Sequence, residues 1–180
     1  MTVPPLPIER LLSIMKALRD PQTGCPWDIK QDFSSIAPYT IEEAYELNEA
    51  IANGARDKIR DELGDLLLQV VFHAQIAEEE GSFTFHDIAN GISDKMIRRH
   101  PHVFGDKKVK TVTGVRKNWE RIKAEERASE SDGTVGLLSG IATTLPAIVR
   151  AFKLQKRAAS VGFDWPFLEA VIEKLHEETE

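Results

Sequence analysis

The sequence has very little cysteine and no glycine-rich phosphate loop, and each absence excludes a class of site. Cys25 is its single cysteine, so no disulfide can form within the chain and we expect a reducing, cytoplasmic setting. No segment reads G-x-x-x-x-G-K-[ST], so any phosphate must be held by cations and side chains. The histidines form no H-x-x-x-H pair, which argues against zinc. Only Glu173 and His176 have the E-x-x-H spacing, whereas a ferritin-like di-iron bundle needs two such pairs.

Long hydrophobic runs and an excess of positive charge are also absent. No apolar run approaches about 18 residues and no charged-then-apolar leader is present, so we expect neither a transmembrane span nor a signal peptide. The net charge of −6 argues against nucleic acid and anionic membranes as partners. The 42% apolar content of 180 residues is enough for one or two compact domains with a core.

Carboxylates are concentrated on two successive segments with helical periodicity, between Thr40 and Asp65. Within each segment two of them are three residues apart, so each pair projects from one helix face. Two such pairs facing each other would repel strongly unless a cation compensated them, and Mg²⁺ or Mn²⁺ accepts all-oxygen ligands. The candidates are Glu42, Glu43, Glu46, Glu62 and Asp65.

An alternative interpretation needs no metal. Thr40 followed by Glu43 is also a capping box, and acidic side chains are favoured in the first turn of any helix. The second segment favours the metal, because Glu62 and Asp65 directly adjoin the apolar run LLLQVVF, which we expect to be buried. Carboxylates at the edge of a buried helix are costly unless they are paired or metal-bound.

Helical periodicity runs through the rest of the chain and predicts an all-α fold. We expect helices over about 7–19, 40–52, 57–80 and 84–99. The second should begin after Pro38 and end at Asn53-Gly54, the third should end at Gly81, and Thr84 should cap the fourth. Trp27, in the turn-rich segment DPQTGCPWD, is expected to be a packing anchor.

Positive charge is concentrated between Lys95 and Lys123. Lys95 and Arg99 share a helix face beside His100-Pro-His102 and suit a phosphate clamp. Trp119 and Lys123 have the same four-residue spacing, which would permit stacking plus a charge contact, although a core Trp beside a surface Lys is equally ordinary.

The acidic motif, EEAYE followed by ELGD, resembles the E-E-x-x-E plus E-x-x-D signature of the MazG family of nucleoside triphosphate pyrophosphohydrolases, within the all-α NTP pyrophosphatase superfamily. GCPWD, SDKMIRRHPHVFGD and NWERIKAEE resemble MazG sequence in the same order, so the resemblance covers nearly the whole chain. It implies an antiparallel helical bundle, dimeric through its central helices, that hydrolyses nucleoside triphosphates to the monophosphate and pyrophosphate.

The same resemblance implies broad base tolerance and a role in clearing aberrant nucleotides. The expected ligands of Mg²⁺, with Mn²⁺ as a possible substitute, are Glu43, Glu46, Glu62 and Asp65, while Glu42 would orient or deprotonate the attacking water. Lys95 and Arg99 are expected to contact the triphosphate, and Trp119 and Lys123 to contact the nucleotide.

The small polar segment 129–140 predicts a linker between a MazG-like domain, 1–128, and the start of a second copy, 141–180. LPAIVRAFKLQKRA echoes IERLLSIMKALRD, and VGFDW echoes GCPWD. The second copy reaches Glu180 inside its own acidic motif, so either it belongs to a longer two-repeat protein or its helices serve only to pack.

Two alternatives to a broad pyrophosphohydrolase remain open at this point. A narrower enzyme, acting on dUTP, dCTP or phosphoribosyl-ATP, would share the acidic motif. The chain could instead be a structural half of a two-repeat protein, which dimerises and leaves the chemistry to another copy. A homodimer is expected in either case, since the apolar run LLLQVVFHA needs more partner surface than one short bundle offers.

Overall fold

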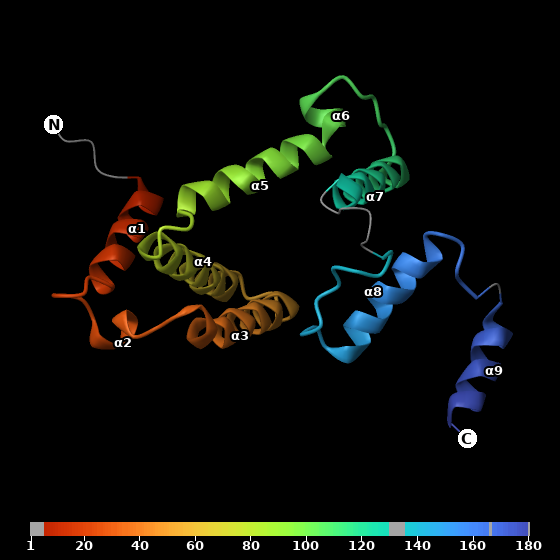
Figure 1. Ribbon diagram of the computed structural model, residues 1–180, viewed down its shortest axis with the longest axis horizontal. Coiled ribbons are helices and arrows are strands. Elements are labelled where there is room, and N and C mark those ends of the chain that lie inside the picture. The colour runs from red at the N-terminus through yellow and green to blue at the C-terminus, as the bar shows by residue number, and fades with distance from the viewer. Residues whose placement is uncertain (1–5, 130–135, 166, 180) are drawn as a thin grey trace. The chain divides into compact units, whose positions relative to one another are not determined.

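The computed structural model describes residues 6–129, 136–165 and 167–179, which form helices joined by turns, with no strand among them. This confirms the all-α prediction. Figure 1 traces the helices in chain order. Their bounds are α1 Pro7–Leu18, α2 Pro26–Ile29, α3 Phe33–Ala52, α4 Arg56–Glu79, α5 Phe85–Arg99, α6 Pro101–Phe104, α7 Val112–Ser129, α8 Ala147–Ala159 and α9 Leu168–Thr179.

The chain divides into two units, Met1–Lys107 and Lys108–Glu180. The first contains α1 to α6 and the second α7 to α9. Half of the predicted linker 129–140, residues 130–135, lies outside the described residues. The predicted second copy, 141–180, follows this linker. That it repeats the fold of the first copy stays a prediction.

The α3–α4 hairpin is the centre of the first unit. Asn53 ends α3 and Gly54 follows in the left-handed region at φ 68°, where glycine carries no Cβ penalty. The predicted stop at Asn53-Gly54 is therefore confirmed, and so is the stop at Gly81, whose φ is 71°. Because only three residues join α3 to α4, the two helices run antiparallel and pack along their length.

The predicted start of the metal-motif helix was wrong. The helix begins at Phe33, seven residues before Thr40, and contains Pro38. Asp32 caps it by accepting from the Ser35 amide at 2.8 Å, and the Ser35 hydroxyl accepts in return from the Asp32 amide at 2.9 Å. Pro38 costs one backbone hydrogen bond near the start of the helix, and the cap together with burial of Ile36 offsets that cost. Thr40 therefore lies inside α3 and does not cap the helix.

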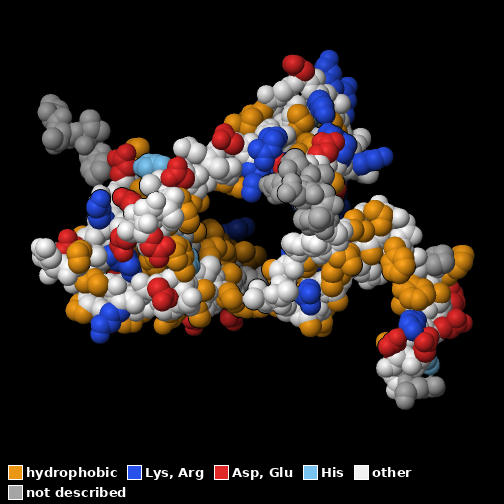
Figure 2. Space-filling model, in the orientation of Figure 1, with side chains coloured by type: hydrophobic (Ala, Val, Ile, Leu, Met, Phe, Trp, Pro, Cys, Tyr) orange, Lys and Arg blue, Asp and Glu red, His pale blue; other side chains and the backbone are white. Residues whose placement is uncertain are grey.

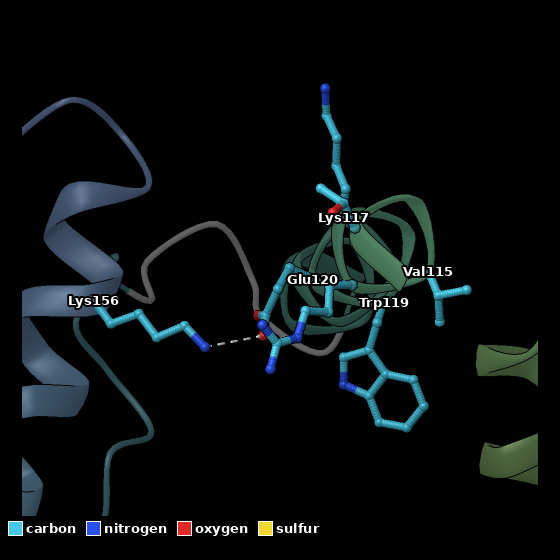
Figure 3. A pocket seen from close by; sticks show the side chains of 7 residues that line it. Val115, Lys117, Trp119, Glu120 and Lys156 are labelled. Atoms are coloured by element: carbon cyan, nitrogen blue, oxygen red, sulfur yellow. Dashed lines mark ion pairs between the residues drawn. The ribbon is translucent and has the colours of Figure 1, made fainter. Parts of the chain in front are cut away.

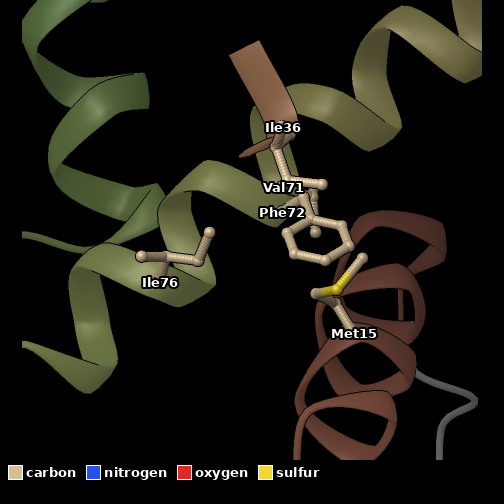
Figure 4. Packing of buried hydrophobic residues seen from close by; sticks show 5 residues of the cluster. All are labelled: Met15, Ile36, Val71, Phe72 and Ile76. Atoms are coloured by element: carbon tan, nitrogen blue, oxygen red, sulfur yellow. The ribbon is translucent and has the colours of Figure 1, made fainter. Parts of the chain in front are cut away.

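The core of the first unit lies where α1 and α3 meet the second half of α4. Met15, Ile36 and Val71 are almost completely enclosed, and Figure 4 shows the Met15 side chain directed at the Phe72 ring. The buried part of the predicted apolar run is its second half, because Leu67 in the first half remains 40% exposed whereas Val71 and Phe72 are buried. The buried cluster consists of Met15, Ile36, Val71, Phe72 and Ile76.

The α5 helix begins where the sequence predicted. The Thr84 hydroxyl accepts from the Asp87 amide, and the Asp87 carboxylate accepts from the Thr84 amide at 2.9 Å, forming the capping box. The helix packs against α4 and ends at Arg99, and Pro101 opens the short α6. Among the described residues, no helix is long and apolar enough to cross a membrane.

Candidate active site

Three of the predicted carboxylates converge between α3 and α4. Glu43 from α3 and Glu62 and Asp65 from α4 each offer an oxygen, and these oxygens lie within 4.8 Å of one another. Glu43 and Glu62 are partly buried and Asp65 is exposed, so the group opens to solvent on one side.

The register of buried residues explains why these side chains face inward. Glu43 is seven residues from both Ile36 and Ala50, which are buried, so all three lie on nearly the same line of α3. On α4, Glu62 is seven residues before the buried Gln69. The carboxylates therefore continue the buried faces of the two helices toward the α3–α4 turn.

The electrostatics of this group favour a bound cation. Burial raises the pKa of Glu43 above its ordinary value, and the neighbouring charges of Asp65, Glu46, Glu62 and Glu42 raise it further, in that order of effect. Three hard oxygen donors from two rigid helices fit Mg²⁺ or Mn²⁺, which would relieve this repulsion.

The structure places the other two acidic candidates near this group but outside it. Glu46 and Glu42 are both exposed, and each raises the pKa of Glu43 through its charge. On a helix of 3.6 residues per turn, a side chain three positions on is rotated by about 60° from the first. The Glu46 side chain therefore points to one side of the buried face of α3, on which Glu43 lies.

The predicted phosphate clamp belongs to the same unit as the carboxylates. Lys95 and Arg99 lie on α5 at four-residue spacing, with Lys95 exposed and Arg99 partly buried. The helix that carries them packs against α4, the helix that carries Glu62 and Asp65.

The predicted nucleotide contacts Trp119 and Lys123 belong to the second unit. Lys123 pairs with Glu120 at 3.6 Å on α7. Trp119 lines an open hollow of about 710 Å³, where Lys156 of α8 reaches Glu120 at 3.6 Å. Figure 3 shows Trp119 and Lys117 leaving α7 in different directions.

A cavity that the sequence analysis did not predict lies one helical turn from the carboxylates. It measures about 160 Å³, and its mouth carries two half-exposed aromatic residues, Trp27 and Tyr39. A signal for it was present in the sequence, because Tyr39 is four residues before Glu43 and Gln69 four residues after Asp65. The remaining lining residues are Met15, Leu18, Asp28, Ile36, Leu68, Gln69 and Phe72.

The short helix α2, which carries Trp27, and the residues that follow it are held by a buried arginine. Arg19 donates through Nη1 to the carbonyls of Asp28 and Gln31, at 2.5 and 3.0 Å. The Trp27 ring meets those of Phe72 and Tyr39 edge-on, with centroids 6.4 and 6.2 Å apart. Trp27 thus packs as predicted, while about half of its surface stays open to solvent.

Comparison with known proteins agrees with the acidic geometry. Residues 31–104, which include α3, α4 and all five acidic candidates, match the MazG nucleotide pyrophosphohydrolase domain. The chain contains a MazG domain. It is 55% identical over 171 residues to a nucleoside triphosphate pyrophosphohydrolase of Escherichia coli K12, covering 95% of this chain and 64% of that protein.

Two Thermotoga maritima proteins support the same assignment. The chain is 48% identical over 170 residues to the nucleoside triphosphate pyrophosphohydrolase/pyrophosphatase MazG of that organism, covering 94% of this chain and 64% of the relative. A crystal structure of a mazG-related protein superposes with a TM-score of 0.54 at 25% identity, over 64% of this chain and 98% of the other. The chain thus spans 64% of the length of the E. coli and T. maritima pyrophosphohydrolases that it matches.

Proposed function

We propose that this chain hydrolyses nucleoside triphosphates to the nucleoside monophosphate and pyrophosphate with the help of Mg²⁺. The observation that carries the proposal is the convergence of Glu43, Glu62 and Asp65 from two helices. The relatives named as nucleoside triphosphate pyrophosphohydrolases support it. A divalent ion bound there supplies charge neutralisation at the phosphates and lowers the pKa of a bound water.

Each acidic residue has a part in this proposal. Glu43, Glu62 and Asp65 hold the cation, and Glu46, whose charge already acts on Glu43, completes the ligand set. Glu42 is exposed beside them and orients or deprotonates the attacking water. The products require that the bond between the α and β phosphates is broken.

The cationic residues stabilise the charge on the leaving pyrophosphate. Lys95 and Arg99, on α5, form the clamp for the triphosphate. Trp119 and Lys123, on α7, add nucleotide contacts. The proposal includes broad base tolerance, clearance of aberrant nucleotides and a cytoplasmic location, where nucleoside triphosphates are made.

A homodimer is part of the same proposal. Apolar side chains reach the surface of the α3–α4 hairpin, as the orange areas in Figure 2 illustrate for the face in view. Such an exposed apolar surface is typical of a subunit contact.

Analytical ultracentrifugation should give twice the mass of one chain, and a monomer at micromolar concentration would contradict the proposed homodimer. The residues concerned are Ile41, Tyr45, Ile51, Leu63 and Leu67.

The test is release of pyrophosphate from ATP, CTP, GTP and UTP with Mg²⁺, measured for the parent, Glu62→Ala and Glu46→Ala. We expect a loss of roughly 100-fold or more for Glu62→Ala, since one metal ligand is gone, and a smaller loss for Glu46→Ala. Asp57→Asn, which removes an exposed charge from the first turn of α4, is the matched control. Pyrophosphate release unchanged in both alanine variants would refute the site, and an inactive parent would favour the structural half.

A further inference from the structure

We propose that His73 is a positioning residue for the acidic site: its hydrogen bond to Thr40 fixes α3 against α4, and so sets how closely the carboxylates converge. This inference deepens the proposed function and rests on it, because the carboxylates act through the cation that they hold. It gives a role in the site to two residues, His73 and Thr40, outside the acidic motif.

The His73 side chain, on α4, touches α3 at two points. Its Nε2 shares a hydrogen bond of 3.2 Å with the Thr40 hydroxyl, and its ring lies nearly parallel to that of Phe33. Within the described part of the chain, no other hydrogen bond joins a side chain of α4 to a side chain of α3. Apolar contacts between helices tolerate a small slide or rotation, whereas a hydrogen bond weakens steeply with distance and angle. The directional contact between these two helices is therefore made by His73.

This hydrogen bond lies close to the carboxylate that α3 contributes. Thr40 precedes Glu43 by three residues, about 4.5 Å along the helix axis, and both side chains are partly buried where α3 meets α4. The oxygens of Glu43, Glu62 and Asp65 lie within 4.8 Å of one another, so a small slide of α3 is enough to separate them. Fixing Thr40 against α4 therefore fixes Glu43 against the other two carboxylates.

The surroundings of His73 show that stability alone does not explain a histidine at this position. Its Nδ1 is enclosed and has no hydrogen-bond partner among the described residues. An enclosed polar atom without a partner is unfavourable, so an apolar side chain would suit the stability of the fold about as well. In paired helices, a polar side chain in the seam typically costs stability and specifies the register of the two helices. His73 has this property, and Thr40 is its partner on the facing helix.

Mn²⁺ affinity, measured by electron paramagnetic resonance in the parent, His73→Leu and His73→Gln, tests the effect on the site. Leucine removes the hydrogen bond and the unpaired Nδ1 together, whereas glutamine keeps an amide that can bond the Thr40 hydroxyl. We expect His73→Leu to weaken Mn²⁺ binding roughly tenfold with a nearly unchanged melting temperature, and His73→Gln to restore most of the affinity. Gln75→Leu is the matched control, because the partly buried Gln75 bonds Glu79 within α4 itself. Equal Mn²⁺ affinity in the parent and His73→Leu would overturn the inference.

The partner residue gives a second variant. Thr40→Val replaces the hydroxyl by a methyl group of similar size, so it should weaken Mn²⁺ binding about as much as His73→Leu. The double variant should lose no more affinity than either single one, because both changes remove the same hydrogen bond. Losses that add fully in the double variant would contradict a role shared by His73 and Thr40.

A distance measurement in EDTA separates this inference from the proposed function. Spin labels on Ala44→Cys of α3 and Lys58→Cys of α4, both exposed positions, are attached in a Cys25→Ser background, and pulsed electron paramagnetic resonance gives the distribution of distances between them. This distribution should broaden or shift in His73→Leu but not in His73→Gln, and the same distribution in all three proteins would overturn the inference. A parent that binds no Mn²⁺, combined with a broadened distribution in His73→Leu, would count against the proposed cation site alone.

Discussion

The Arg19 side chain is buried against Glu79, sixty residues away in the sequence, and forms a two-pronged ion pair with it. Nε donates to Oε1 at 2.9 Å and Nη2 to Oε2 at 2.6 Å, while the guanidinium carbon lies 5.3 Å from the centre of the Phe72 ring. With the carbonyls of Asp28 in α2 and of Gln31 just after it as further acceptors, Arg19 joins the end of α1, the α2 segment and the end of α4.

Replacing Arg19 should therefore destabilise the first unit far more than replacing a neighbouring exposed lysine. Arg19→Met leaves Glu79 and two carbonyls without their donor, and we expect a loss of about 2 kcal/mol, because Glu79 itself stays partly solvated. Lys16→Met breaks the exposed pair with Glu78, 3.7 Å long, between the same two helices and should cost less than about 0.5 kcal/mol. Urea unfolding of the two variants measures the difference, and equal losses would contradict this role.

The same pair predicts how stability depends on acid pH. The hydrogen bonds from Arg19 are the main cause that lowers the pKa of Glu79 below its ordinary value of 4.5. A lowered carboxyl pKa contributes stability that is present above pH 4.5 and is lost as pH falls through the folded-state value. The difference in free energy of unfolding between Arg19→Met and the parent should thus shrink when urea unfolding is repeated below pH 4, and a constant difference would argue against the ion pair.

Gly24 should tolerate no side chain, although it lies in a surface loop. A Cβ on Gly24 would stand 2.6 and 2.8 Å from the backbone oxygen and nitrogen of Asp20 and would also collide with the Leu18 carbonyl. Backbone atoms cannot move aside cheaply, so Gly24→Ala should cost about 2 kcal/mol and disturb the loop that leads into α2 and Trp27. Gly91, inside α5, has open space around it, and Gly91→Ala should instead stabilise by about 0.5–1 kcal/mol. Thermal melts that show the same sign for both variants would contradict this contrast.

His73 predicts a second pH effect, near neutrality. Its ring is nearly parallel to that of Phe33, with the ring centroids 5.6 Å apart, and its Nε2 shares a hydrogen bond of 3.2 Å with the Thr40 hydroxyl. Burial lowers the pKa of His73 below its ordinary value of 6.5. The folded state therefore resists protonation, so the stability that the neutral ring contributes is present above pH 6.5 and is lost as pH falls through the folded-state value. His73→Phe should show a smaller drop in melting temperature between pH 7.5 and 5.5 than the parent, and an identical drop would refute the assignment.

Much of the fold followed from local signals in the sequence, and the exception is instructive. The Thr84 cap, the Asn53-Gly54 stop and the stop at Gly81 are short motifs whose chemistry is complete within a few residues. The start of α3 was missed because a proline at position 38 usually ends a helix, and here a reciprocal cap between Asp32 and Ser35 outweighs it. Helix propensity alone does not reveal that the cap outweighs the proline.

The site shows the same division between local and tertiary information. Spacing predicted that Glu43 and Glu46 share one helix face and that Glu62 and Asp65 share another. The structure brings Glu43, Glu62 and Asp65 together. Spacing alone did not separate Glu43 from Glu46, because the rotation of α3 is set by burial of Ile36 and Ala50. The cavity beside Gln69 was missed because its walls come from α1, α2, α3 and α4, which only packing brings together.

The central claim is that α3 and α4 hold a divalent cation through converging carboxylates, and Mn²⁺ binding measured by electron paramagnetic resonance tests it most directly. The account predicts saturable Mn²⁺ binding to the parent and to Asp57→Asn, competed by Mg²⁺ and weakened at least roughly tenfold in Glu43→Gln and Glu62→Gln. Equal Mn²⁺ affinity in the parent and in both glutamine variants, all folded, would contradict it.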